Sequence, residues 1–301
     1  MNEAGVLIVG GGFLGRALAL KLAGLDLRVT VLSPHAGEAS WPAGITAVNG
    51  RQEDRALVAS LMDSHETVIH AAWGTTPGSS AERPALEAEK GLNPFLAFLE
   101  TLQRFPETRL LFLSSGGTVY GDPERLPVPE YAPLRPRSCH GVGKAAAELF
   151  LGLLAADRTV ILRPSNIYGT GQPLRSGFGV IPQLLMCTAE DRPFQLWGDG
   201  AQVRDYLYLD DFSEAVYRLV KHPTAAGTFN LGSGTGTSLI ALIGLVEKAT
   251  GRTICIEQQP RRDGDVERIV LDTGRIRSEV EWAPVIGLDE GIARAWNETV
   301  R

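Results

Sequence analysis

Short apolar runs alternate with segments of helical periodicity through the first half of the chain. Six of the runs are continuous, which is typical of strands that are covered on both faces. These runs are residues 6–9, 29–32, 45–48, 67–70, 110–113 and 159–162. Between the first two, Leu14, Leu18 and Leu22 repeat at four-residue spacing and predict a helix. Further helices are predicted at 55–62, 92–103 and 143–156. This alternation predicts an α/β fold built on a doubly wound parallel (Rossmann) sheet with helices on both faces.

The texture changes after Arg163, where glycine and proline become dense up to residue 182. The remaining pattern predicts helices at 183–188, 210–221, 238–250 and 288–296, and a strand at 253–257. We therefore expect a second, smaller mixed α/β domain. The predicted division gives residues 1–165, with a return segment near 204–235, to the sheet domain. It gives residues 166–203 and 236–301 to the second, ligand-binding domain.

Composition narrows the classes of partner. The chain has 301 residues with 29 basic and 35 acidic side chains, a formal charge of -6, so no general attraction for nucleic acid or an anionic membrane is expected. No apolar run approaches the ~20 residues that span a bilayer. Cys139, Cys187 and Cys255 form no CxxC pair, and no cluster of His, Asp or Glu has metal-ligand spacing. We expect no bound metal, no disulfide framework and a cytoplasmic location.

A G-x-G-x-x-G motif lies directly between the first predicted strand and the first predicted helix. Gly10 permits the tight turn, Gly12 lets the backbone approach a pyrophosphate, and Gly15 lets helix and strand pack closely. The helix N-terminus, at Phe13 and Leu14, offers unpaired N–H groups to phosphates. The motif therefore predicts dinucleotide binding.

The sequence leaves NAD and NADP both open. A carboxylate at the end of the second strand favours the free ribose 2′-hydroxyl of NAD. Ser33 stands near this position, so no carboxylate repels the 2′-phosphate of NADP. However, no arginine clearly takes the place of the acid to bind that phosphate. Arg51, after the third strand, is either an adenosine contact or a solvated loop residue.

Several motifs, in one order, extend over nearly the whole chain. They are residues 10–15, 70–72 (HAA), 114–121 (SSGGTVYG), 163–169 (RPSNIYG), 179–182 (GVIP), 197–200 (WGDG), 203–206 (VRDY) and 262–265 (RDGD). Together they resemble the extended short-chain dehydrogenase/reductase family, in its NAD-dependent nucleotide-sugar epimerase/dehydratase branch. The resemblance implies an NAD(P)-dependent enzyme acting on a nucleoside-diphosphate sugar, first of all a 4-epimerase. A 4-ketoreductase or dehydratase, and a degenerate cofactor- or nucleotide-sugar-binding protein, remain alternatives.

The resemblance also implies a catalytic tyrosine four residues before a lysine. Lys144 is in place, but the tyrosine position holds His140, and the accompanying Ser/Thr position falls on Gly116. Ser115 and Thr118 flank that glycine and could supply the hydroxyl. A histidine can act as acid or base near neutral pH, although its ring nitrogen reaches about 2 Å less far than a tyrosine oxygen.

The remaining expected contacts also follow from the resemblance. Cofactor contacts are expected at Ala71, Ala72, Trp73, Lys144 and Pro164. Substrate contacts are expected at Asn166, Val180, Trp197, Arg204, Tyr206, Arg262 and Asp265. The two arginines are assigned to the diphosphate, because guanidinium forks suit its oxygens. His70 is expected to satisfy backbone groups. A homodimer formed through helices 92–103 and 143–156 is implied as well.

Overall fold

The computed structural model describes residues 5–173, 179–261 and 266–299 of the chain. They form two compact units. The first, here called the sheet unit, comprises Met1–Ser115, Cys139–Arg163 and Ser213–Phe229. The second unit comprises Gly116–Ser138, Pro164–Phe212 and Asn230–Arg301. Segment 116–138, which the sequence analysis gave to the sheet domain, clusters with the second unit.

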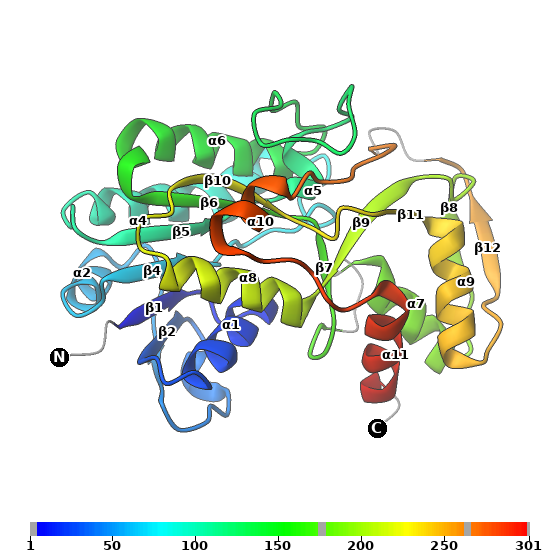
Figure 1. Cartoon of the computed structure of the whole chain (residues 1–301), viewed down its shortest axis with the longest axis horizontal. Helices are drawn as coiled ribbons and strands as arrows, with labels where there is room; N and C mark the ends of the chain where they lie inside the picture. Colours follow the sequence, from blue (N-terminus) through cyan, green and yellow to red (C-terminus); the bar gives the residue numbers. More distant parts are fainter. Residues whose placement is uncertain (1–4, 174–178, 262–265, 300–301) are drawn as a thin grey trace. The chain divides into compact units, whose positions relative to one another are not determined.

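A seven-stranded sheet forms the centre of the sheet unit, with the strand order β10-β6-β5-β4-β1-β2-β3 (Figure 1). Its strands are β1 (Val6–Val9), β2 (Val29–Ser33), β3 (Ile45–Asn49), β4 (Thr67–His70), β5 (Arg109–Leu113), β6 (Thr159–Pro164) and β10 (Gly227–Leu231). β1 pairs in parallel with β2 and with β4, so the chain runs outward on both sides of the first strand. All six continuous apolar runs are strands of this sheet, and the predicted doubly wound fold is confirmed.

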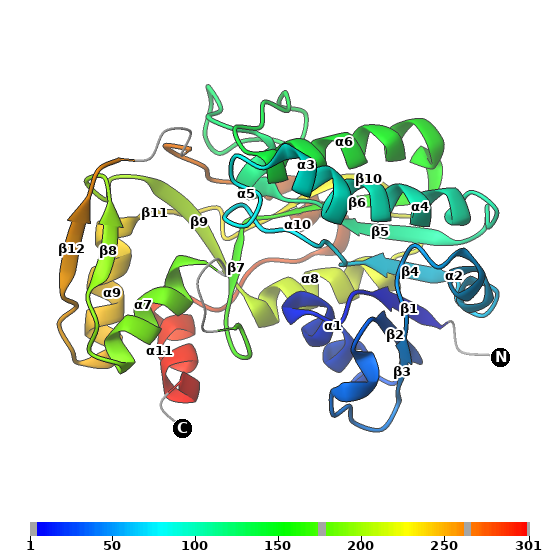
Figure 2. The same ribbon diagram turned by 180° about the vertical axis from the view of Figure 1, so that it is seen from behind.

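Helices cover both faces of the sheet (Figures 1 and 2). α1 (Phe13–Ala23) and α8 (Leu209–Lys221) lie on one face, where Lys21 and Glu214 form an ion pair of 2.8 Å. α2 (Arg55–Met62), α4 (Asn93–Leu102) and α6 (Cys139–Leu154) lie on the other. Their apolar sides form one buried cluster with the sheet, which includes Phe98 and Leu151. Burial of these apolar sides determines which side of each helix faces the sheet.

The second unit is smaller and mixed, as expected. One sheet has the order β11 (Gly236–Ser238), β9 (Val203–Tyr208), β7 (Asn166–Tyr168), and a second pairs β12 (Ile256–Gln259) with β8 (Phe194–Trp197). α7 (Val180–Ala189), α9 (Leu239–Thr250) and α11 (Leu288–Thr299) contribute to one core around Leu184, Leu242 and Trp296. Two short helices, α5 (Gly116–Val119) and α10 (Gly274–Val280), complete the unit.

Several element boundaries differ from the prediction by three or four residues, among them the starts of α6, α7 and β12. α6 begins at Cys139 and not at residue 143, which places His140 inside the helix. The last strand begins at Ile256, because it pairs with β8 from Phe194 onward, and not at residue 253. The short elements that were not predicted in the sheet unit are α3 (Pro84–Glu87), the π-helical turn η2 (Ala88–Leu92), and the 3-10 turns η1 (Ala36–Glu38) and η3 (Ala156–Arg158). Within the described residues, no helix combines the length and apolar character that crossing a membrane demands.

Candidate active site

The glycine-rich turn after β1 fits the phosphates of a dinucleotide. Gly10 has φ +111°, and a Cβ there would lie 2.6 Å from the backbone nitrogen of Ala72. A Cβ on Gly15 would lie 1.8 Å from the carbonyl oxygen of Gly10. At Gly12, by contrast, no heavy atom of the described chain, its immediate neighbours aside, lies within 4 Å of such a Cβ. Two glycines thus close the turn, and the third leaves an open backbone face before the N-terminus of α1.

The other expected cofactor residues near this turn lie at the start of α1 and at the ends of β2 and β4. Phe13 and Leu14 form the first turn of α1, where backbone N–H groups have no helical acceptor. Ala71 donates its N–H to the carbonyl oxygen of Val9 at 2.8 Å, and with Ala72 it follows the end of β4. Ser33 ends β2.

Two further expected cofactor residues lie at the ends of the sheet elements. Arg51 is exposed after β3 and lies 3.7 Å from the carboxylate of Glu53. Pro164 ends β6 and belongs to the second unit.

His140 and Lys144 stand one helical turn apart on α6, and both are buried, with 8% and 5% of their surface exposed. The Lys144 ammonium donates to the carbonyl oxygen of Leu113 at 2.6 Å. It also lies 4.0 Å from the ring centroid of Trp73 and 4.9 Å from that of Phe112. A lysine and a histidine four residues apart on a helix share one face, so both side chains point to one site.

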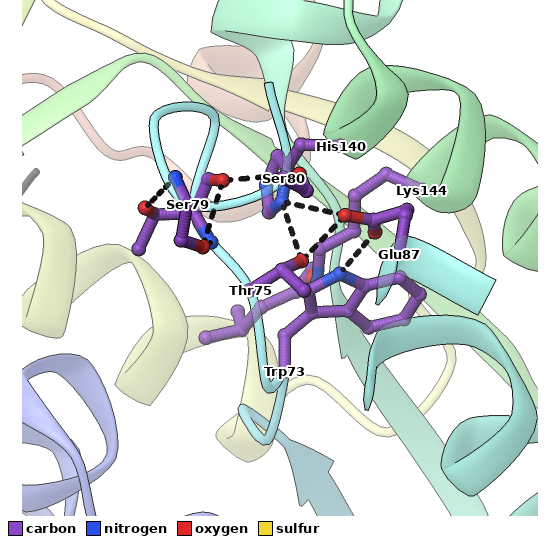
Figure 3. A network of polar contacts seen from close by, with 9 residues as sticks. Trp73, Thr75, Ser79, Ser80, Glu87, His140 and Lys144 are labelled. Atoms are coloured by element: carbon purple, nitrogen blue, oxygen red, sulfur yellow. Dashed lines mark hydrogen bonds and ion pairs between the residues drawn. The ribbon is translucent and has the colours of Figure 1, made fainter. Parts of the chain in front are cut away.

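A buried carboxylate joins this site (Figure 3). Glu87, at the end of α3, is 3% exposed. Its Oε1 accepts a hydrogen bond from the indole N–H of Trp73 at 2.8 Å, and its Oε2 accepts one from the Thr75 hydroxyl at 2.6 Å. Nδ1 of His140 lies 3.3 Å from the Thr75 hydroxyl oxygen and 4.0 Å from Oε2 of Glu87. The sequence analysis missed Glu87 and Thr75.

Two glycines leave the space that this carboxylate fills. A Cβ on Gly143 would lie 2.4 Å from Oε1 of Glu87. A Cβ on Gly91, in the π-helical turn η2, would lie 2.7 Å from the indole nitrogen of Trp73. A Cβ at residue 91 would also lie 2.8 Å from Oε1 of Glu87, so the glycine leaves room for both Trp73 and Glu87.

Burial dominates the electrostatics of the site. It lowers the pKa of His140 to about 4, and the nearby Lys144 charge lowers this pKa further while Glu87 raises it. Burial also lowers the pKa of Lys144 to about 7, although Glu87 and Glu148 act in the opposite direction. At pH 7 the imidazole is therefore neutral and able to accept a proton, and the ammonium is close to its titration point.

The two candidate hydroxyls lie in different units. Ser115 follows β5 in the sheet unit, whereas Thr118 lies on α5 in the second unit. Gly116, at the start of α5, is buried. The Thr118 Oγ1 is buried and forms no hydrogen bond within the part of the chain that the structure describes. An unpaired buried hydroxyl of this kind is suited to bond a ligand.

Two of the expected substrate residues have hydrogen-bond partners within the second unit, and a third is buried there. Asn166 donates its amide to the carbonyl oxygen of Asp205 at 2.9 Å. Arg204, on β9, donates to the carbonyl oxygen of Val203 at 3.0 Å. Tyr206 is buried, and burial raises the pKa of its phenol to about 12, although the nearby Arg204 charge acts in the opposite direction.

A pocket of the second unit contains Trp197 together with Arg261 and Arg268, two arginines that sequence reasoning did not single out. Val180 begins α7. Arg262 and Asp265, the remaining predicted substrate residues, lie outside the described residues.

His70 packs in the aromatic core of the sheet unit and has a side-chain partner. Its Nε2 lies 2.5 Å from the side-chain oxygen of Gln52. The ring packs among Phe95, Phe98 and Phe112, with centroids 4.7 to 5.8 Å apart. This environment lowers the pKa of His70 to about 3, chiefly through burial and secondarily through the Lys144 charge.

Comparison with known proteins gives the family of this chain. Residues 6–232 match the NAD dependent epimerase/dehydratase family, and the chain belongs to that family. The family recognised from the sequence is thereby confirmed.

Individual relatives agree with this assignment. The chain is 31% identical to a UDP-glucose 4-epimerase of Mycolicibacterium smegmatis over 76% of this chain and 74% of that protein. It is 29% identical to a dTDP-4-dehydro-6-deoxyglucose reductase of Escherichia coli over 97% of this chain and 96% of that protein. The crystal structure of a Thermus thermophilus UDP-glucose 4-epimerase in complex with NAD matches with a TM-score of 0.88, 29% identity and 98% coverage of both chains. These relatives represent the first two activities that the sequence analysis weighed.

Proposed function

We propose that this protein is an NAD-dependent 4-epimerase of a nucleoside-diphosphate hexose, with His140 as the acid/base group. The observation that carries the proposal is the pairing of His140 and Lys144 on one face of α6, in the unit that also holds the open glycine turn. The substrate class is supported by the UDP-glucose 4-epimerases to which the chain is similar.

In the proposed reaction, the glycine turn at Gly10, Gly12 and Gly15 would hold a nicotinamide dinucleotide, which would supply reversible hydride transfer at C4 of the sugar. His140 accepts the proton of the C4 hydroxyl as that hydride leaves, and gives it back in the second half-reaction. Burial keeps the imidazole neutral, and therefore basic, before the first transfer. Lys144 supplies positive charge beside the developing oxyanion.

NAD is proposed over NADP for two reasons. The Thermus relative contains NAD. In addition, the carboxylate of Glu53 lies beside Arg51, the one cation that the sequence analysis placed near the adenosine, and would disfavour a 2′-phosphate there. The other proposed cofactor contacts are the glycine turn with Phe13 and Leu14, Ser33, Ala71, Ala72, Trp73 and Pro164.

The substrate contacts remain proposals that rest on the family resemblance. We assign Ser115 or Thr118 to the hydroxyl that assists proton transfer, with the unpaired Oγ1 of Thr118 as its support. The other proposed contacts are Asn166, Val180, Trp197, Arg204, Tyr206, Arg262 and Asp265.

A homodimer is proposed from the surface of α6. Val142, Leu149 and Leu153 are 54%, 71% and 78% exposed on this helix, which is unusual for large apolar side chains. Phe150 and Leu154 add to the same helix surface. A second copy of the chain would cover it.

A 4-ketoreductase is the second candidate, favoured by the similarity to the Escherichia coli reductase.

One experiment distinguishes the epimerase from the reductase. The purified protein is denatured and its supernatant assayed for NAD, and the native protein is incubated with UDP-, dTDP- and GDP-hexoses without added cofactor. We expect released NAD and a new C4 epimer, and no product from His140→Ala. Product formation only with added NADPH and a 4-keto sugar would indicate the reductase. Calorimetric binding without any conversion would show a binding protein and overturn both.

A further inference from the structure

The position of one hydrogen in the site can be deduced from its acceptors. The Thr75 hydroxyl has a single proton, and it lies between a carboxylate oxygen at 2.6 Å and the imidazole Nδ1 at 3.3 Å. The Thr75 hydroxyl donates this proton along the shorter contact, to Oε2 of Glu87. The Thr75 oxygen then has only lone pairs to offer His140, so Nδ1 must carry a hydrogen to bond it. The neutral imidazole is thus fixed with its proton on Nδ1.

We infer that Glu87, acting through Thr75, is a positioning residue that holds His140 as the Nδ1–H tautomer and leaves Nε2 as the basic nitrogen. This inference rests on the proposed role of His140 as acid/base. Nε2 is the ring nitrogen farther from the backbone, and it has no hydrogen bond to any described residue. The tautomer therefore places the lone pair on the ring nitrogen that extends farthest from the backbone. This matters because a histidine side chain is shorter than a tyrosine side chain.

The same arrangement stabilises the charge that develops during proton transfer. When Nε2 accepts the hydroxyl proton and the hydride leaves the sugar carbon, the ring becomes an imidazolium. Its Nδ1–H then lies 4.0 Å from Oε2 of Glu87, with the Thr75 hydroxyl between them. Lys144 opposes this charge, so the carboxylate offsets a repulsion that the family's neutral phenol does not face.

Glu87 is itself held in place by two hydrogen-bond donors, Trp73 and Thr75. The Trp73 indole donates to Oε1, and the Trp73 ring contacts the Lys144 ammonium. A polar group buried to 3% exposure needs hydrogen-bond partners, and Trp73 and Thr75 supply them here. Orientation of a histidine by a hydrogen-bonded acid is a recurrent solution to the same chemical problem.

The test is the tautomer of His140, measured by NMR through correlations between the ring protons and the two ring nitrogens in ¹⁵N-histidine-labelled protein. The His140 signals are assigned from their loss in His140→Gln. In the wild type at pH 7 we expect the hydrogen on Nδ1. In Glu87→Gln the amide N–H would donate to Thr75, whose hydroxyl would then donate to Nδ1, and the hydrogen would move to Nε2. Thr75→Ser keeps the hydroxyl and the wild-type tautomer, whereas Thr75→Val removes the bond from Nδ1.

Activity gives a second and separate readout. With UDP-glucose and bound NAD, kcat of Glu87→Gln should fall by about 10²-fold or more with little change in KM, since acid–base catalysis contributes about 10²–10⁴-fold. Hydrogen on Nε2 in the wild type, or a tautomer that Glu87→Gln leaves unchanged, would overturn the inference. Near-ultraviolet circular dichroism shows whether each variant is folded. If Glu87→Gln does not fold, the NMR spectrum of the wild type still shows which ring nitrogen of His140 carries the hydrogen. A wild-type Nδ1–H tautomer that shifts as stated, in a protein that converts no sugar, would refute the proposed function alone.

Discussion

Gly143 faces the carboxylate of Glu87 so closely that a Cβ at residue 143 would lie 2.4 Å from Oε1 and 3.0 Å from Cγ. Glycine in the middle of a helix is otherwise unfavourable by about 1 kcal/mol relative to alanine. Here it lets α6 approach α3 and keeps Glu87 in contact with Trp73 and Thr75. The arrangement of His140, Thr75 and Glu87 thus requires that residue 143 has no Cβ.

Gly143→Ala should displace the Glu87 carboxylate and reduce activity. Overpacking of a buried contact costs about 1–3 kcal/mol, which exceeds the gain in helix propensity, so the free energy of unfolding should fall. Urea unfolding and kcat with UDP-glucose measure the two effects. Gly244→Ala in α9 is the matched control, because within the described chain a Cβ there has no neighbour within 4 Å. That variant should be as stable as the wild type or up to about 1 kcal/mol more stable. Equal behaviour of the two variants would refute the account of Gly143.

The pH dependence of kcat/KM should show a basic limb that belongs to Lys144. Burial lowers the pKa of Lys144 to about 7, so its charge is present below pH 7 and is lost as the pH rises through that value. The pKa of His140, lowered to about 4, leaves the imidazole in its basic form throughout this range. We therefore expect kcat/KM to fall as the pH rises from 6 to 8.

Lys144→Arg provides the check on this assignment. The guanidinium stays charged to pH 12 and beyond, so any residual activity of the variant should lose the decline between pH 6 and 8. A decline of the same midpoint in Lys144→Arg would assign the basic limb to another group.

The apolar surface of α6 predicts the assembly state. Light scattering at micromolar concentration should give twice the mass of one chain for the wild type, and the mass of one chain for the double variant Leu149→Glu/Leu153→Glu, because two carboxylates would be buried in the interface. Val285→Glu is the control: Val285 is 82% exposed in the second unit, outside α6, and its change should leave the mass doubled. A wild-type mass of one chain would contradict the proposed dimer.

The sequence predicts those features of the fold and the site that depend on residues close together along the chain. Six strands of the large sheet follow from local apolar runs, and the phosphate turn follows from glycines within six residues. Glu87 gave no such signal, because it stands near Glu89 and Lys90 in what resembles a solvated helix face. Glu87 is buried because Gly143, 56 residues later in the chain, has no side chain that would occupy the same space. A contact between residues so far apart leaves no periodic pattern in the sequence.

His70 should make the protein sensitive to acid. Its pKa is about 3 in the folded chain and about 6.5 in the unfolded chain, so between these values the unfolded state binds a proton that the folded state does not. The free energy of unfolding should consequently fall by about 1.4 kcal/mol for each pH unit from 6 toward 4 on account of this residue. His70→Phe suits the surrounding Phe95, Phe98 and Phe112, whereas His70→Gln keeps a polar group, and neither titrates. Urea unfolding at pH 4.5, 5.5 and 6.5 should show the same loss of slope in both variants despite different absolute stabilities. His140 titrates in all three proteins, so its contribution cancels from the comparison. If the wild type and both variants lost stability in parallel, His70 would be ruled out as the group that links folding to acid.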